Sequence, residues 1–324
     1  MKPITAASTP PARVWLAWLA AWAAVAIGAG WQLATRDGAR SSLAPLDLAL
    51  LRYTVPALLL APVWWRHGLL PGPDLSVVRF TLIVAGAGLP FGLLAMVGAS
   101  YAPAAHMGAL IPGLSPLLTL LGASLLGLGA MTRLTTTTTV TTMTTLTSTR
   151  AVGPGVTLCG VLLVVFPVLM VSTVNTQSLI LGDGLFVAAA AMWTAYTLAF
   201  RGSRLQPLQA VSVISAYSAL MVVPLWLMAY VKGDTRLLQA PAHEVALQFL
   251  MQGVLTGVVG LYVIGFAIRG IGATRTAAAG ALVPVVVALG AWFFLGEAMT
   301  AYLFLGSVVT SLGVWLMLKA SRNQ

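Results

Sequence analysis

The chain has 324 residues, of which 59% are hydrophobic and 7% are charged. A soluble protein has about 25% charged residues because water must solvate its surface, so this composition excludes a soluble globular domain. The net charge of +10 comes from basic residues that stand singly or in pairs between apolar segments, which indicates the positive-inside rule rather than a nucleic-acid-binding face.

Ten apolar segments follow one another along the chain, and a helix needs about 20 apolar residues to cross a bilayer. None of them shows the alternation that is typical of a membrane β-barrel. In chain order they span residues 14–35, 46–65, 77–100, 105–129, 151–171, 183–202, 208–231, 245–268, 273–295 and 299–318. We therefore predict an all-α membrane protein with ten transmembrane helices.

The distribution of basic residues predicts the orientation. With the N-terminus in the cytoplasm, twelve of the 17 Lys and Arg residues lie on the cytoplasmic side. The other five lie outside: Arg36, Arg40, Arg52, Lys232 and Arg236. This excess predicts a bacterial-type inner (plasma) membrane protein with two cytoplasmic tails, residues 1–13 and 319–324.

Internal self-similarity divides the chain into two halves. A shift of 162 residues aligns Trp31 with Trp193, and a shift of 168 residues aligns Pro116 with Pro284. Further pairs are Thr35 with Thr197, Pro45 with Pro207, Trp64 with Trp226, Gly153 with Gly306, Thr157 with Thr310 and Gly160 with Gly313. We predict repeats over 14–171 and 182–318. Each has five helices, and because five is odd the second is inverted in the membrane.

The stretch TRLTTTTTVTTMTTLTSTR, from Thr132 to Arg150, interrupts this regularity. Across it the aligning shift drops from 168 to 153 residues, so the first half carries 15 extra residues at this join. A lone strand would lack a partner in a helical bundle, and a glycosylated stalk does not fit a cytoplasmic join. We predict a flexible cytoplasmic loop over 130–150 that transport does not need.

Three residue patterns resemble the EamA type of the drug/metabolite transporter superfamily. They are Leu43-Ala-Pro-Leu-Asp-Leu-Ala-Leu-Leu-Arg52-Tyr53, then Trp193-Thr-Ala-Tyr196, and finally Pro284 with Phe294-Leu-Gly-Glu297 and the glycines from Gly306 to Gly313. The resemblance covers about residues 14–318 and implies a transporter fold without implying a substrate. The chain departs from the family in having Gly28-Ala-Gly30-Trp31 where Trp-Gly is usual, and in having Gly129 at the position that aligns with Glu297.

Five polar or aromatic residues are candidates for substrate binding. Trp31 and Gln32 lie toward the outer end of the first helix, where a ring and an amide could line a cavity, although an interfacial aromatic belt explains Trp31 as well. Trp193 and Tyr196 are three residues apart and share one helix face. Tyr262 is a weaker candidate, because packing explains it equally well.

Four residues are candidates for gates. His106 and Thr274 occupy matched positions at the starts of the fourth and ninth helices, where capping of a helix is the alternative role. Arg269 and Arg275 flank an inner turn, where they could attract an anion or simply fix the topology.

Prolines and glycines predict features of the helices themselves. Pro116 and Pro284 each remove a helix hydrogen bond, so both are candidate kinks that shape a cavity. Gly253 and Gly257 are four residues apart, which lets two helices approach closely.

No catalytic pattern is present, so an enzyme is not predicted. The three His residues are far apart, Cys159 is the only cysteine, and neither a metal site nor a cofactor motif occurs. All seven acidic residues lie at or near the ends of predicted helices, which leaves no obvious buried carboxylate for proton coupling. Glu297 is expected to end a helix.

The predicted function is secondary-active export of small neutral or zwitterionic metabolites such as amino acids, by alternating access. One alternative is an exporter of drugs or organic anions that uses Arg269 and Arg275. Another is a membrane binding or scaffold protein without transport activity. The expected partners are a small-molecule substrate and the lipid bilayer, with a proton or another ion as a candidate for coupling and no nucleic acid.

Overall fold

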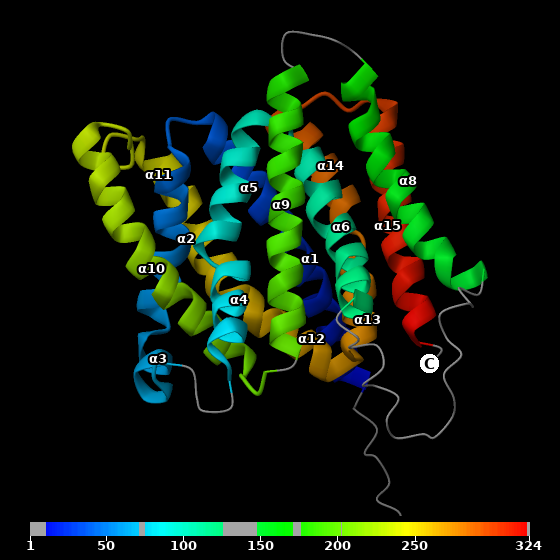
Figure 1. Ribbon diagram of the computed structural model, residues 1–324, viewed down its shortest axis with the longest axis horizontal. Coiled ribbons are helices and arrows are strands. Elements are labelled where there is room, and N and C mark those ends of the chain that lie inside the picture. Colours follow the sequence, from blue (N-terminus) through cyan, green and yellow to red (C-terminus); the bar gives the residue numbers. More distant parts are fainter. Residues whose placement is uncertain (1–10, 71–74, 126–147, 171–175, 202, 323–324) are drawn as a thin grey trace, which may run out of the picture.

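A computed structural model describes residues 11–70, 75–125, 148–170, 176–201 and 203–322, which form a bundle of helices (Figure 1). The helices are α1 (Pro11–Arg40), α2 (Pro45–Leu59), α3 (Ala61–His67), α4 (Val77–Ala87), α5 (Leu89–Tyr101), α6 (Ala104–Leu125), α8 (Ser148–Met170), α9 (Thr176–Arg201), α10 (Pro207–Lys232), α11 (Ala242–Gln248), the π-helix η1 (Phe249–Val259), α12 (Gly260–Ile271), α13 (Ala273–Gly280), α14 (Val283–Leu295) and α15 (Ala301–Arg322). The described residues contain no strand, so the predicted all-α class is confirmed. Most of the Thr-rich loop lies outside the described residues.

Within the described residues, eight helical segments are long and apolar enough to cross a membrane. A ninth is obtained if α2 and α3, which are bent by 63° at their junction, count as one span. The apolar part of α8, Val152–Pro167, is shorter than the others. Large apolar side chains cover the outside of the bundle, for example Leu58, Phe293 and Leu125, which are 74%, 74% and 86% exposed. Such a surface suits contact with lipid tails rather than with water.

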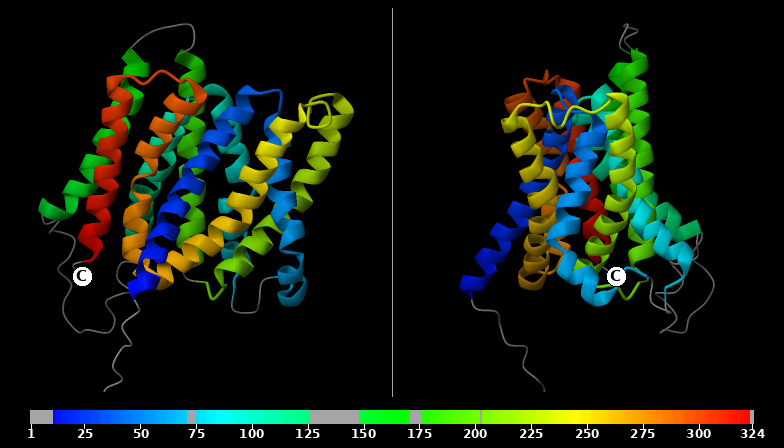
Figure 2. Two further views of the ribbon diagram at one scale, coloured as in Figure 1. Left: turned by 180° about the vertical axis from the view of Figure 1, so that it is seen from behind. Right: turned by 90° about the vertical axis from the view of Figure 1, so that its left-hand side faces the viewer.

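The helices run side by side between two ends of the bundle (Figures 1 and 2). At one end, named here the Lys319 end, α1 begins and α15 finishes. At the opposite end, named the Glu297 end, α1 finishes and α15 begins. Helices α8 and α15 lie together at one edge of the bundle, while α2 and α10 lie toward the other edge.

Several helices are interrupted where a proline begins the next segment. α4 is followed by a break at Gly88, and α5 then begins with Pro90 in its first turn. In the same way, α14 has Pro284 in its first turn, after the break at Ala281 and Leu282. Proline fits a first turn because its missing N–H has no helical acceptor there. The two matched prolines therefore differ: Pro284 begins a helix, whereas Pro116 lies inside α6.

Glycines bring particular helices close together. A side chain at Gly253 would clash with Val55, and one at Gly257 would clash with Pro56, which confirms the predicted close approach at this pair. Helices α8 and α15 meet in a reciprocal way. A side chain at Gly160 would meet the backbone of Thr310, and one at Gly313 would meet that of Thr157.

Candidate functional site

Aromatic rings from three helices meet in the core of the bundle. Phe91 of α5 lies between Trp31 of α1 and Trp193 of α9, with ring centroids 5.8 and 5.3 Å away. Trp193 also contacts Tyr196, one turn along α9, at 5.1 Å. Trp31 is buried, whereas Trp193 is 38% exposed. The structure thus brings three of the five predicted binding residues into one aromatic row.

Arg52 lies against the buried end of this row. Its guanidinium carbon is 4.5 Å from the centroid of the Trp31 ring, within the range of a cation–π interaction. Its Nη1 donates a long hydrogen bond of 3.5 Å to Oε1 of Gln252. The ion pairs of the described residues do not include Arg52. The distribution of basic residues predicts that Arg52 lies outside the membrane, but the structure places it two turns into α2.

Two glutamines connect Arg52 to α1. Nε2 of Gln252 donates to Oγ1 of Thr35 at 3.0 Å and to Oε1 of Gln248 at 3.3 Å. Nε2 of Gln248 donates to the carbonyl of Ala34 at 2.8 Å. Gln252 lies in η1, and π-helical turns occur frequently at functional sites. We name Trp31, Thr35, Arg52, Gln248 and Gln252 the Arg52 cluster.

Buried polar atoms without a hydrogen-bond partner gather at the Arg52 cluster. Nε1 of Trp31 and Nε of Arg52 are both buried and unpartnered, and so is Oε1 of the neighbouring Gln32. Nearly all buried polar atoms in proteins are paired. The two unused donors of Trp31 and Arg52, with an unused acceptor on the next residue of α1, therefore suit a ligand that has both acceptors and donors.

A second group of polar side chains, around Glu297, links helices at the Glu297 end. Oε1 of Glu297 accepts from Nε of Arg36 at 2.7 Å, and its Oε2 accepts from the backbone N–H of Ala104 at 2.9 Å. Arg36 also donates to the carbonyl of Ala99. Glu297 therefore follows the end of α14, as expected from the sequence, and also links α1 to the first turn of α6. Arg36, Glu297 and His106 line a cavity of about 390 Å³ at this end.

His106 contacts a buried aspartate, Asp183, and this pair was not predicted from the sequence. Nδ1 of His106 lies 2.8 Å from Oδ1 and 3.1 Å from Oδ2 of Asp183 on α9. Both residues are buried. The sequence offered no obvious buried carboxylate because Asp183 is the first residue of its predicted span, whereas α9 begins at Thr176 and holds Asp183 two turns inside the helix. Burial here comes from the neighbouring helices and not from depth along the span.

A third acidic residue, Asp47, is fully buried in the first turn of α2. Its Oδ1 accepts from Nε1 of Trp226 at 2.7 Å, and its Oδ2 accepts from the backbone N–H groups of Ala44 and Arg236, both at 2.9 Å. Asp47 therefore ties α2 to α10 and to the segment that follows α10. It is a structural anchor at the Glu297 end.

The remaining predicted site residues lie away from the Arg52 cluster. Tyr262 on α12 is 56% exposed, and Thr274, Arg269 and Arg275 are exposed around the junction of α12 and α13 at the Lys319 end. His106 is at the opposite end from Thr274. The structure brings neither Arg269 nor Arg275 to the aromatic row.

Pro116 and Trp193 line one cavity together. This cavity of about 310 Å³ also touches Thr119, Thr197 and Arg201. Since these residues succeed one another along α6 and α9 toward the ends of both helices, the cavity leads from Trp193 toward the Lys319 end. Trp193 therefore both lines this cavity and contacts Phe91.

Comparisons with known proteins agree with this architecture. Ten chains of solved structures match. One of them, described as "Crystal structure of protein", has a TM-score of 0.58 and 16% sequence identity over 93% of this chain and 97% of its own length, so the likeness concerns the fold alone. No curated protein matches the chain.

The model of the EamA-like transporter family matches residues 180–319, and these residues include α9 to α15 almost completely. This match is to a family of transporters, which fits the apolar helices of the described residues. Over residues 180–319 the chain is therefore similar to the EamA-like transporter family, in agreement with the resemblance seen in its sequence.

Proposed function

We propose that this protein is a secondary-active transporter that exports small zwitterionic metabolites such as amino acids across a bacterial-type inner membrane. The Arg52 cluster carries the proposal. It offers a half-buried guanidinium without a carboxylate partner among the described residues, next to the unpartnered Nε1 of Trp31 and Oε1 of Gln32.

The chemistry of these groups fits an amino acid. A carboxylate accepts from Nε of Arg52 and Nε1 of Trp31, and an ammonium donates to Oε1 of Gln32. Hydrogen bonds to a charged group are the strong ones, and in a site shielded from water they select for the charge they complement. The row from Phe91 to Trp193 gives the substrate side chain an apolar surface.

Two inverted repeats of five helices would supply the two access states. We count the ten spans as α1, α2 with α3, α4 with α5, α6, α8, α9, α10, α11 through α12, α13 with α14, and α15. The reciprocal contacts of α8 and α15 support the symmetry, because Gly160 meets Thr310 and Gly313 meets Thr157. These pairs match at one shift of 153 residues.

The first and sixth spans add a further correspondence. Oγ1 of Thr35 donates to the carbonyl of Trp31 at 2.7 Å, and Oγ1 of Thr197 donates to that of Trp193 at 2.8 Å. Both tryptophans then contact Phe91 from opposite sides. The matched residues of the two halves therefore meet at one place, where a transporter of this symmetry binds its substrate.

Alternating access gives the two ends of the bundle different roles. We assign the ion pair of Arg36 with Glu297 to the gate at one end, and the cavity beside Trp193 to the substrate path toward the other end. With both termini in the cytoplasm the Lys319 end is cytoplasmic, and this arrangement is the state that loads substrate from inside. Release then requires the contacts of Glu297 to break.

The test uses purified protein and a panel of related ligands. Arg52→Gln should weaken binding of a bound amino acid about 10- to 100-fold, since one charged hydrogen-bonding group is lost. For the unmodified protein, the amide or the decarboxylated amine of the same amino acid should compete poorly. Arg66→Gln, which removes an exposed arginine on α3, is the matched control.

Flux in reconstituted vesicles completes the test. A monodisperse Arg52→Gln protein should transport slowly, while Arg66→Gln should match the unmodified protein. Unchanged affinity and flux in Arg52→Gln, or equal competition by the amide and the amino acid, would overturn the assignment of Arg52 to the substrate carboxylate.

A further inference from the structure

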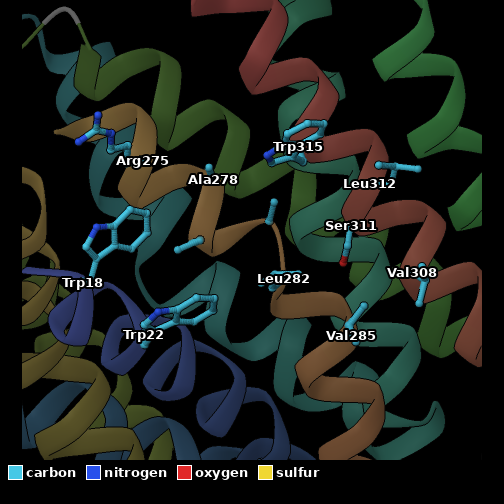
Figure 3. A pocket seen from close by; sticks show the side chains of 12 residues that line it. Trp18, Trp22, Arg275, Ala278, Leu282, Val285, Val308, Ser311, Leu312 and Trp315 are labelled. Atoms are coloured by element: carbon cyan, nitrogen blue, oxygen red, sulfur yellow. The ribbon is translucent and has the colours of Figure 1, made fainter. Parts of the chain in front are cut away.

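A large cavity lies outside the Arg52 cluster, on the lateral surface of the bundle near the Lys319 end. It has a volume of about 560 Å³ and lies between α1, the junction of α13 and α14, and α15 (Figure 3). Trp18 and Trp22 project into it from α1, and Trp315 comes from α15 (Figure 3). We name it the tryptophan groove.

The walls of the tryptophan groove are apolar but open to the outside of the bundle. Trp18, Trp22 and Trp315 are 37%, 47% and 40% exposed. Tryptophan rings are favoured at the level where lipid headgroups meet acyl chains. An elongated apolar groove on the lateral surface of a membrane protein suits an acyl chain, because a polar solute would gain nothing from these walls.

One edge of the groove is positively charged. Arg275 lines the groove and is exposed, and Nζ of Lys319 lies 5.2 Å from the centroid of the Trp315 ring. None of the residues that line the groove is acidic. Two basic residues, Arg275 on α13 and Lys319 on α15, therefore flank an apolar groove. This arrangement is complementary to a lipid that has an anionic headgroup and an acyl chain.

The groove also contains an unused hydrogen-bonding group. Ser311 of α15 is 5% exposed, and its buried hydroxyl has no hydrogen-bond partner. Figure 3 shows this hydroxyl directed from α15 toward the space beside Leu282, at the break between α13 and α14. A buried hydroxyl without a partner is costly, and an ester carbonyl of a lipid would accept its hydrogen.

We propose that the tryptophan groove is a binding site for an anionic phospholipid. Arg275 and Lys319 hold the phosphate, Ser311 donates to an ester carbonyl, and an acyl chain lies between Trp18, Trp22 and Trp315. The lipid belongs to the leaflet at the Lys319 end. It contacts α1 from the first half of the chain and α13 and α15 from the second, so it bridges the two halves.

Native mass spectrometry of the purified full chain tests this proposal without a transport assay. The probes are phosphatidylglycerol and phosphatidylcholine with identical acyl chains. The unmodified protein should retain phosphatidylglycerol preferentially. Arg275→Gln and Lys319→Gln should each weaken that binding about fivefold, the effect of one basic residue near an anionic lipid. Trp22→Ala should weaken the binding of both lipids.

Matched controls come from α3 at the same end of the bundle. Arg66→Gln removes an exposed arginine, and Trp65→Ala removes a tryptophan that is 80% exposed; both should leave lipid binding unchanged. Equal retention of the two lipids by the unmodified protein would overturn the proposal. The same conclusion follows if Arg66→Gln and Arg275→Gln reduce phosphatidylglycerol binding to the same extent.

Discussion

At the residue scale, buried polar side chains with complete hydrogen bonding differ from those with incomplete bonding. Both oxygens of Asp47 are occupied, by Trp226 and by two backbone N–H groups. Arg52 and Trp31 each keep an unused donor. Complete bonding stabilises the folded state, whereas an unused buried donor is available to a ligand. We therefore expect Asp47 to contribute to stability, and we propose that Arg52 contributes to binding.

We expect Asp47→Ala to destabilise the protein by about 1–3 kcal/mol, because the Trp226 indole N–H and two backbone N–H groups lose their acceptor in a buried setting. Thermal unfolding in detergent measures this. Asp234→Ala, which removes an exposed carboxylate from the same end, should leave the unfolding temperature nearly unchanged. Equal unfolding temperatures for the two variants would show that Asp47 is not an anchor.

Trp193→Ala should reduce transport much more than it reduces expression. Trp193 contacts Phe91 and Tyr196 and lines the cavity toward the Lys319 end, and each aromatic contact contributes about 0.5–1.5 kcal/mol. A loss of flux of about tenfold is therefore expected in vesicles that contain equal amounts of protein. Trp65→Ala is the control. If flux and expression fall together, Trp193 serves packing instead.

At the element scale, contacts between helices depend on small residues and on polar pairs. Gly160 and Gly313 let α8 and α15 touch through their backbones. The glycine spacing of Gly253 and Gly257 was readable in the sequence, since it needs only the period of a helix. The pair of His106 with Asp183 was not readable, since 77 positions separate the partners and their meeting depends on how α6 and α9 are rotated.

Gly160→Ala tests the contact between α8 and α15. Its methyl group would overlap the backbone of Thr310, so the helices must separate, and we expect a destabilisation of about 1–3 kcal/mol. Gly155→Ala on the same helix has nothing within 4 Å and should be neutral or stabilising by up to about 1 kcal/mol. Thermal unfolding of the two variants should therefore shift in opposite directions or by clearly different amounts.

At the scale of the whole molecule, the proposed repeat of five helices would explain why the two halves use matched residues for matched contacts. The two halves differ at the join before the last helix of each. In the second half residues 296–300 connect α14 to α15. The first half has the Thr-rich insertion there, whose size follows from the drop of the aligning shift from 168 to 153 residues.

Deletion of residues 133–147, which removes 15 residues of the insertion, should leave transport within about twofold of the intact protein. The physical reason is that loop-closure free energy changes slowly with loop length, and the second half makes the same join with fewer residues. Flux in reconstituted vesicles measures the outcome. A collapse of flux with normal folding would show that the tract takes part in transport.

The sequence alone determined the all-α membrane class, the approximate positions of the helices, the resemblance to EamA-like transporters and the tight glycine packing. These follow from local properties, namely the length of apolar runs against the thickness of a bilayer and the spacing of small residues on one helix. The sequence also selected Trp31, Gln32 and Trp193 as candidates, because their positions along the predicted helices suit the lining of a cavity.

Only the tertiary structure decided that Arg52 faces Trp31 and Gln252 inside the bundle, that Asp183 and Asp47 are buried, and that Tyr262 is exposed. Arg52 and Gln252 are 200 positions apart, and Asp47 and Trp226 are 179 apart. Such pairs depend on which helices are neighbours and on how each is rotated about its axis. Neither quantity is encoded in a run of adjacent residues, so the partners of these polar groups appear only once the helices have packed.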